Sequence, residues 1–391
     1  MRPEAELLLC CARARLEPEQ ADRIRRLAGD GIDWNALVEM GKVHAVAQML
    51  YVHLRDACPD AVPGPVMDDL RAYFQGNAHQ SLLLTGELLA ILDLLDEHGI
   101  PAIPYKGPVL AASAYGNLAL RQFGDLDLLV HPEDIPRARE VLLGSGYEAQ
   151  VQMTASQERA YLRRQGDVGL VRADGRVTVE IHSRMSPPYW SFPGDPAYWW
   201  CHLTTVSLGH RQVPSLAPEA LLLFLCIHNA KHSGERLIWT CDVAELIRSH
   251  QNLDWEQVLR DAAELRCKRI LSLGLLLAAD LLDAPLPPEV YRHASSDVVA
   301  RQLAGQVHGV LFPEENDRRV ILQRALFRLR TRERLADRVQ YGVRLATTLT
   351  PDDWASISLP SALFPLYYVI RAGRLARNYG LSGLRWLRAR S

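Results

Sequence analysis

Lysine is scarce in this chain of 391 residues. Only four of the 44 basic residues are lysines, and they are Lys42, Lys106, Lys231 and Lys268. The chain has 46 acidic residues and a formal net charge of −2, so it has no overall positive field to attract nucleic acid or an anionic membrane. We therefore expect neither of them as a partner. A lysine next to acidic residues stands out against this background.

The chain also lacks the cysteine spacing of metal-binding knuckles and disulfide-rich domains. Its seven cysteines are an odd number, no two are spaced as C-x-x-C, and most lie in apolar runs. Such cysteines are typical of reduced thiols packed as small hydrophobic side chains. No N-terminal signal peptide is evident, and the longest apolar stretches, 220–227 and 271–279, are shorter than a membrane span. These features predict a cytoplasmic protein.

The pattern of apolar residues divides the chain into three regions. Residues 1–81 and 215–391 have helical periodicity, including one long helix from Trp34 to Tyr51. Residues 82–214 alternate short strands with glycine-containing turns and helices. We expect an α+β protein in which a mixed-sheet core is flanked by an N-terminal helical region and a C-terminal helical domain.

Two carboxylates define the stretch RQFGDLDLLV, residues 121–130. Asp125 and Asp127 are separated by one apolar residue, Leu126, and the run that follows is typical of a buried strand. Residues two apart on a strand point to the same face, so both carboxylates should project together from the sheet. Neighbouring carboxylates repel unless protons or cations neutralise them, and magnesium is the usual cation at phosphate-handling sites.

Two further elements could complete a site for metal and phosphate. Residues 176–182, RVTVEIH, alternate as a strand that places Glu180 and His182 on its polar face. Upstream, a short extended segment leads into the Lys106-Gly107 turn and a helix start, whose free backbone N–H groups can cradle phosphate. Three carboxylates on neighbouring strands could hold two metal ions and activate a hydroxyl for in-line attack on phosphate.

The order of these elements resembles the nucleotidyltransferase fold of the DNA polymerase beta superfamily. It comprises a strand, a K-G turn, a helix, an R-x-x-x-D-x-D strand and an E-x-H strand. The chain is similar in particular to a bacterial family described only as nucleotidyltransferase family proteins. The D-W-x-x-L stretch from Asp33 and the L-P-x-x-L-x-P-L-Y-Y stretch from Leu359 extend the similarity over most of the chain.

The resemblance implies a role for each matching residue. Asp125 and Asp127 would be metal ligands, and Glu180 would be the third carboxylate. The nucleotide-binding residues that we predict are Lys106, Gly107, Arg121, His182 and Lys231. The superfamily usually has G-G or G-S at the turn and Asp as the third carboxylate, so Lys106 and Glu180 depart from its pattern.

These residues predict a transferase that uses Mg²⁺ or Mn²⁺. It would move a nucleotidyl group from a nucleoside triphosphate, such as ATP, to a hydroxyl of a peptide, sugar or small molecule. Kinase-type transfer of the γ-phosphate at the same site is one alternative, and a non-catalytic nucleotide-binding protein is another.

Each of three other segments allows two interpretations. His228 and His232 have the spacing of zinc ligands on a helix, but no third ligand is obvious, so their face could instead pack against the sheet. The arginine-rich segment 318–349 could grip a polyanion or form a solvated face paired with acidic residues. Segment 183–196, rich in Pro, Tyr and Trp, could be a substrate lid or a packed connector.

Overall fold

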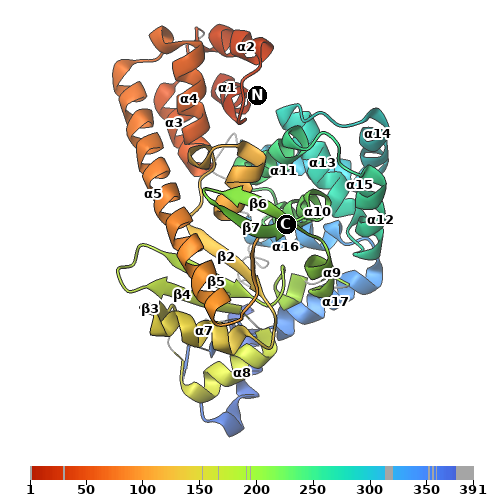
Figure 1. Cartoon of the computed structure of the whole chain (residues 1–391). Helices are drawn as coiled ribbons and strands as arrows, with labels where there is room; N and C mark the ends of the chain where they lie inside the picture. Colours follow the sequence, from red (N-terminus) through yellow and green to blue (C-terminus); the bar gives the residue numbers. More distant parts are fainter. Residues whose placement is uncertain are drawn as a thin grey trace.

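A five-stranded mixed sheet with helices on both faces forms the centre of the protein, which confirms the predicted α+β class (Figure 1). The computed structural model describes residues 2–29, 31–151, 153–165, 167–190, 192–193, 195–312, 320–350, 353–354, 356–357 and 359–375. Residues 376–391, at the end of the predicted C-terminal helical domain 215–391, lie outside the described residues.

The sheet has the strand order β1-β2-β5-β4-β3. Its strands are β1 (Ala102–Pro104), β2 (Asp125–Val130), β3 (Tyr147–Ala149), β4 (Asp167–Arg172) and β5 (Thr178–His182). The central pair, β2 and β5, is parallel, and the other pairs are antiparallel. The outer strands, β1 and β3, are only three residues long.

The two faces of the central strands differ as their alternating sequences predict. Leu126, Leu128, Val179 and Ile181 lie in an apolar cluster under α5 (Gly64–Glu97) and α7 (Ile135–Gly144). The opposite face carries Asp125, Asp127, Glu180 and His182, and it faces the C-terminal helices. The only apolar residue of β2 on that side, Leu129, belongs to a second apolar cluster with the helical regions.

The N-terminal region is helical, and its elements are α1 (Pro3–Cys11), α2 (Pro18–Ala28), α3 (Trp34–Val43) and α4 (Ala47–Ala57). The prediction of one long helix from Trp34 to Tyr51 is wrong, because Ala45 has a φ of 58° that ends α3. The break is held by His44, whose backbone oxygen accepts a hydrogen bond from Ile238 and whose ring contacts the Leu311 carbonyl at 2.9 Å.

Helix α5 connects the N-terminal helices to the sheet and runs along one side of the molecule (Figure 1). Its first half contributes Met67 and Leu70 to the apolar cluster of the helical regions. Its second half contributes Leu84, Leu88 and other residues to the cluster under the sheet. The predicted boundary at residue 81 falls inside this continuous helix, between the parts that enter the two clusters.

The C-terminal region consists of helices packed against one another, and α11 also packs against residues 111–115, the segment that precedes β2. They are α10 (Pro218–Lys231), α11 (Leu237–Ser249), α12 (Trp255–Glu264), α13 (Lys268–Leu282), α14 (Pro288–Ser296), α15 (Val298–Leu311), α16 (Val320–Thr331), α17 (Leu335–Thr347) and α19 (Leu366–Leu375).

Several short elements were not predicted from the sequence. Helices α8 (Ala155–Gln165) and α9 (Ala197–Cys201) and the hairpin of β6 (Leu203–Leu208) and β7 (Arg211–Leu216) belong to this group. The hairpin lies beside β1. Within segment 183–196, Trp190 is fully buried and lies under the guanidinium of Arg332, which favours a packed connector over a lid.

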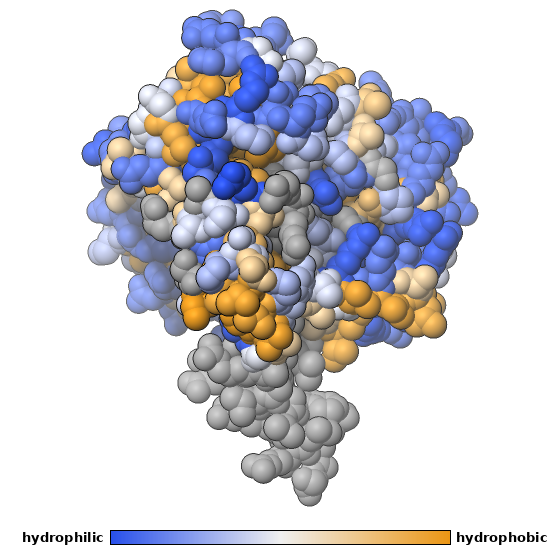
Figure 2. Space-filling view, turned by 90° about the horizontal axis from the view of Figure 1, so that it is seen from below, coloured by the Kyte–Doolittle hydropathy of each residue, from blue (hydrophilic) through white to orange (hydrophobic). Residues whose placement is uncertain are grey.

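Length and composition alone would allow α5 to cross a membrane. Its buried side packs in both apolar clusters, as in the core helix of a globular protein, and a single helix of this kind is weak evidence for a span. Seen from below, the surface is mostly hydrophilic, and its apolar side chains form separate patches (Figure 2).

The arginines of segment 318–349 do not form one open stripe. Arg324 pairs with Glu235, Arg330 donates to Gln302, and Arg338 donates to the backbone oxygen of Arg332 at 3.0 Å. These contacts favour the interpretation that the arginines pair with other groups of the protein over the interpretation that they bind a polyanion.

Candidate metal and nucleotide site

A cluster of acidic and imidazole groups lies where β2 and β5 run side by side. The parallel register places Asp127 opposite Glu180, and His182 follows two residues later on the same face. Ligand atoms of Asp127, Glu180 and His182 all lie within 4.8 Å of one another. Asp127 is only 4% exposed, so this carboxylate is the deepest part of the cluster.

His182 bridges three carboxylates. Its Nε2 lies 3.3 Å from both Asp127 Oδ1 and Glu180 Oε2, and its Nδ1 lies 3.4 Å from Asp167 Oδ1. Burial opposes the charged form, but these acidic partners hold the pKa of His182 well above its usual value. The three carboxylates therefore favour the protonated form of this ring over the neutral form.

The predicted K-G turn lies directly against this cluster. Lys106 Nζ is 2.8 Å from Asp127 Oδ2, and Gly107, with a φ of 56°, begins the short helix α6 (Gly107–Leu110). The buried Tyr105 hydroxyl donates to Asp127 Oδ1 at 3.4 Å. Burial would raise the pKa of Asp127, but Lys106 and then His182 hold it well below the usual value.

Asp125 lies at the start of β2 and does not belong to the three-residue group. It shares the face of Asp127, as the spacing predicts, and its register partner is Thr178. Burial, and then the charge of Asp127, raise the pKa of Asp125. A nearby cation would lower that pKa again, so Asp125 remains a candidate ligand at the rim.

Arg121 is held by an acidic partner from the C-terminal region. Its Nε and Nη2 contact the two carboxylate oxygens of Asp242 at 2.7 and 2.9 Å, and both side chains are buried. The hydroxyl of Tyr115 also donates to Asp242, at 2.7 Å. Arg121 thus ties the acidic strand to α11, and its predicted contact with nucleotide phosphates stays a prediction.

Lys231 is a half-buried cation at the end of α10. Among the contacts of the described residues it has no hydrogen bond or ion pair, and burial followed by repulsion from Lys106 lowers its pKa to about 8. Asp127, Glu180 and Asp167 act in the opposite direction. The charges that set this pKa show that Lys231 belongs to the electrostatic surroundings of the acidic cluster.

The pair His228 and His232 packs beside Lys231. Their rings are 4.7 Å apart, and the ring of His232 lies 4.5 Å from that of Trp239. Burial, followed by neighbouring cations, lowers the pKa of both, to about 3 for His232. Within the described part of the chain neither belongs to a group of three possible metal ligands, so the zinc reading gains no support.

The donor set Asp127, Glu180 and His182 fits a divalent cation. Carboxylate oxygens suit Mg²⁺ and Mn²⁺, and an imidazole nitrogen suits Mn²⁺ better than Mg²⁺. His182 would have to lose a proton before acting as a ligand, so metal binding and protonation of this ring compete. Asp125 could add a further oxygen from the same face.

Two residues of the site were not predicted from the sequence, Tyr105 and Asp167. Asp167 opens β4 and is the register partner of His182. The Asp174-Gly175 dipeptide, where Gly175 has a φ of 73°, is a turn signal that could have revealed the pairing of β4 with β5 and hence the position of Asp167.

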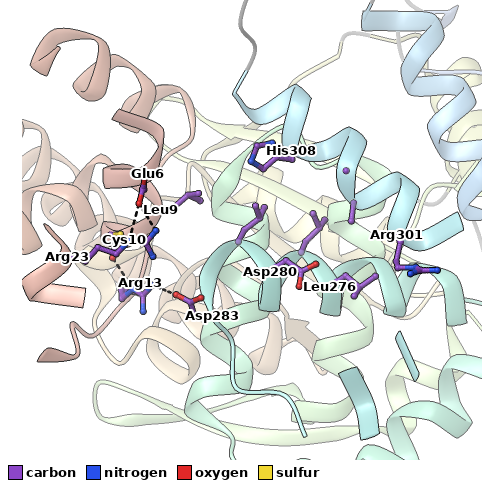
Figure 3. A pocket seen from close by; sticks show the side chains of 14 residues that line it. Glu6, Leu9, Cys10, Arg13, Arg23, Leu276, Asp280, Asp283, Arg301 and His308 are labelled. Atoms are coloured by element: carbon purple, nitrogen blue, oxygen red, sulfur yellow. Dashed lines mark hydrogen bonds and ion pairs between the residues drawn. The ribbon is translucent and has the colours of Figure 1, made fainter. Parts of the chain in front are cut away.

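Two cavities are relevant to ligand binding. A cavity of about 330 Å³ opens onto Asp167, Glu180 and His182. A larger one, of about 600 Å³, lies between α1 and α2 on one side and α13 and α15 on the other (Figure 3). None of the predicted site residues lines the larger cavity, where ion pairs such as Arg23 with Glu6 use the charged side chains. Because the acidic and imidazole side chains line the smaller of these two cavities, we place the candidate site there.

The comparisons with known proteins identify the family of the chain. Residues 30–283 match a family model described as "Uncharacterised nucleotidyltransferase". The comparison with curated proteins found no match, and the comparison with solved structures found none. The matched range contains the entire five-stranded sheet together with α10 and α11, which carry Lys231 and Asp242.

Proposed function

The chain belongs to this family of uncharacterised nucleotidyltransferases, and we propose that it transfers a nucleotidyl group from a nucleoside triphosphate, ATP in the first instance, to a hydroxyl group. The family supports nucleotidyl transfer in general and gives no support to kinase-type transfer of the γ-phosphate. The nucleotide, the ion and the acceptor are parts of our proposal, as is action in the cytoplasm.

One observation carries the proposal, namely that Asp127 and Glu180 are register partners beside a lysine-glycine turn. We assign Asp125, Asp127 and Glu180, with His182, to a divalent cation, Mg²⁺ or Mn²⁺. Bound there, such an ion would offset the negative charge that develops on the transferred phosphate. This set of groups also argues against a non-catalytic nucleotide-binding protein, which would not need three carboxylates on one face.

Cations on the other side of Asp127 suit the triphosphate. Lys106 and Lys231 would hold phosphate oxygens, and the backbone at Gly107 would let the phosphates approach the start of α6. Each lysine gains a partner in this way. Lys231 is half-buried and has no ion pair among the described residues, so a phosphate would supply its counter-ion.

The transfer forms one bond and breaks one. The acceptor hydroxyl oxygen bonds to the α-phosphorus while the bond from that phosphorus to the pyrophosphate oxygen breaks. The hydroxyl proton passes to a carboxylate, for which Glu180 is placed at the cavity, and pyrophosphate leaves. The acceptor is a peptide, a sugar or another small molecule with a free hydroxyl.

The test is mass spectrometry of candidate acceptors incubated with the protein, ATP and Mg²⁺ or Mn²⁺. We expect an acceptor mass gain of one AMP and release of pyrophosphate. The substitution Asp127→Asn should lower the rate by at least about 100-fold, because it removes a charged metal ligand. Glu148→Gln, an exposed carboxylate on β3 of the same sheet, is the matched control and should leave the rate unchanged. A mass gain of phosphate, or an unchanged rate in D127N, would refute the proposal.

A further inference from the structure

The smaller cavity has a different set of charged side chains from the region around Lys106 and Lys231. Its lining includes Asp167, Glu180 and His182. Neither Lys106 nor Lys231 lines it. The groups that would receive a triphosphate and the groups that line this cavity are therefore separate, and they share the acidic cluster as their boundary.

The charges of the cavity lining leave an excess of carboxylate. Glu158 is paired with Arg139. Among the ion pairs of the described residues, His182 is the basic partner of both Asp167 and Glu180, and it also contacts Asp127 outside the cavity lining. The lining therefore has three carboxylates, Glu158, Asp167 and Glu180, against two basic side chains, Arg139 and His182.

The remaining walls are aromatic and weakly polar. Tyr161 and Tyr189 lie on the wall together with Met153, and Thr348 and Thr350 come from the segment after α17. Tyrosine faces attract an ammonium group through the ring quadrupole, and a carboxylate adds a direct ion pair. Threonine hydroxyls can exchange hydrogen bonds with a polyhydroxylated molecule.

We infer that this cavity binds the acceptor and that the acceptor is an amine-bearing hydroxyl compound, with its ammonium group at Asp167 and the tyrosines. The role of this ligand as the acceptor rests on the proposed function. The preference of the cavity for a cationic ligand does not depend on that function. The volume, about 330 Å³, suits a molecule of one or two sugar rings, and a hydroxyl of that molecule can reach Glu180.

Because the basic and acidic side chains lie in different regions, the triphosphate and the acceptor would bind in different places. A triphosphate is attracted by Lys106, Lys231 and the proposed divalent cation, and it is repelled by Asp167. An ammonium group is repelled by those lysines and attracted by Asp167. An acceptor with a negative charge would be repelled by Asp167, so the cavity selects against it.

The potential of the cavity can be measured without any enzymatic assay. The variants T348C, on the cavity wall, and T347C, exposed on the neighbouring position of α17, each receive a new thiol. Each is labelled with a trimethylammonium-ethyl and a sulfonato-ethyl methanethiosulfonate, and peptide mapping separates the new thiol from the exposed Cys201. We expect the ratio of cationic to anionic labelling rates to be at least tenfold higher at position 348 than at position 347.

Binding of matched hexoses tests the ligand class. Glucosamine, glucose and glucuronate have similar sizes and carry charges of +1, 0 and −1. Saturation-transfer NMR on the full chain without nucleotide should give affinities in the order glucosamine, glucose, glucuronate. Asp167→Asn should remove at least a tenfold advantage of glucosamine over glucose, with circular dichroism as the check on folding.

Several outcomes would overturn the inference. They are equal labelling ratios at positions 347 and 348, glucuronate binding as tightly as glucosamine, no binding of glucosamine, or a preference that is unchanged in D167N. AMP transfer to acceptors without regard to charge would refute the inference while supporting the proposed function. A preference for glucosamine without any AMP transfer would do the reverse.

Discussion

Lys231 is a side chain whose charged form is unfavourable in the free protein and would be stabilised by a bound phosphate. It ends α10 as a half-buried cation, and Lys106 repels it. The protein tolerates this because a partly desolvated lysine can lose its proton, and its pKa is lowered to about 8. A bound phosphate would supply the missing negative charge and restore the usual preference for the charged form.

The affinity for nucleotide should therefore depend on pH. The pKa of Lys231, about 8, is below the usual 10.5, so the free protein loses this charge as the pH rises through 8. Affinity for a non-hydrolysable ATP analogue should be full below pH 8 and fall above it, by up to about tenfold per pH unit. Calorimetric titration between pH 6.5 and 9.5 measures this directly.

Two variants assign that pH dependence to one residue. Lys231→Met should weaken binding at pH 7 by roughly 10- to 100-fold, the value of one charge-assisted hydrogen bond, and should flatten the curve around pH 8. Lys268→Met, at an exposed position that begins α13, should behave like the wild-type protein. An unchanged curve in K231M would remove Lys231 from the nucleotide site.

The Arg121–Asp242 pair should be a strong contributor to stability. Both groups are buried and joined by two hydrogen bonds, so Asp242→Asn leaves a buried guanidinium without its counter-charge. We expect a loss of about 3–5 kcal/mol in the free energy of unfolding, measured by urea denaturation. Asp22→Asn, in an exposed pair with Arg25, should change it by less than about 1 kcal/mol. Equal effects of the two substitutions would contradict the structural role of the buried pair.

Among the elements, the turn before α6 is the one whose backbone conformation matters most for the site. Gly107 has a φ of 56°, and a Cβ added there would lie 3.5 Å from the Asp125 backbone oxygen. Gly107→Ala should cost about 1–2 kcal/mol of stability, because an L side chain is strained in this region. It should also weaken binding of the ATP analogue.

Gly99 provides the matched control for that turn. Its φ is 63° and nothing lies within 4 Å of an added Cβ, but it is at the end of α5 and away from the acidic cluster. Gly99→Ala should cost a similar amount in urea denaturation and leave nucleotide affinity unchanged. Loss of affinity in both variants would mean that the turn acts only through stability.

Alternation along single strands was readable from the sequence, but pairing between distant segments was not. Asp125, Asp127 and Glu180 were predicted because each strand has a period of two, which is a local property. Asp167 was missed because its position depends on which strands pair and in which register. The partner of Arg121, Asp242, is 121 residues away, so only the packing of α11 against the segment before β2 reveals it.

At the scale of the whole molecule, α5 couples the N-terminal helices to the sheet. It contributes Leu70 to one apolar cluster and Leu88 to the other. An unbroken helix of 34 residues transmits disruption of either cluster to the other. We therefore expect the described regions to unfold together as one cooperative unit.

Gly76, in the middle of α5, offers a test of that coupling. It is exposed, and nothing lies within 4 Å of an added Cβ. Gly76→Ala should raise the free energy of unfolding by about 0.5–1 kcal/mol, since alanine favours the helix. Gly76→Pro should lower it by about 3 kcal/mol or more and split the denaturation curve into two transitions, followed by circular dichroism. A single transition in G76P would show that contacts other than the helix provide the coupling.

The short outer strands of the sheet also determine how copies of the protein meet in concentrated solution. An exposed strand edge can recruit a strand from another chain and begin a growing aggregate. Here β1 has three residues, ends at Pro104 and lies beside the β6–β7 hairpin. At the other edge, β3 also has three residues and carries the exposed, charged Glu148. Neither edge offers a long, flat template, so the sheet is protected against polymerisation through its edges.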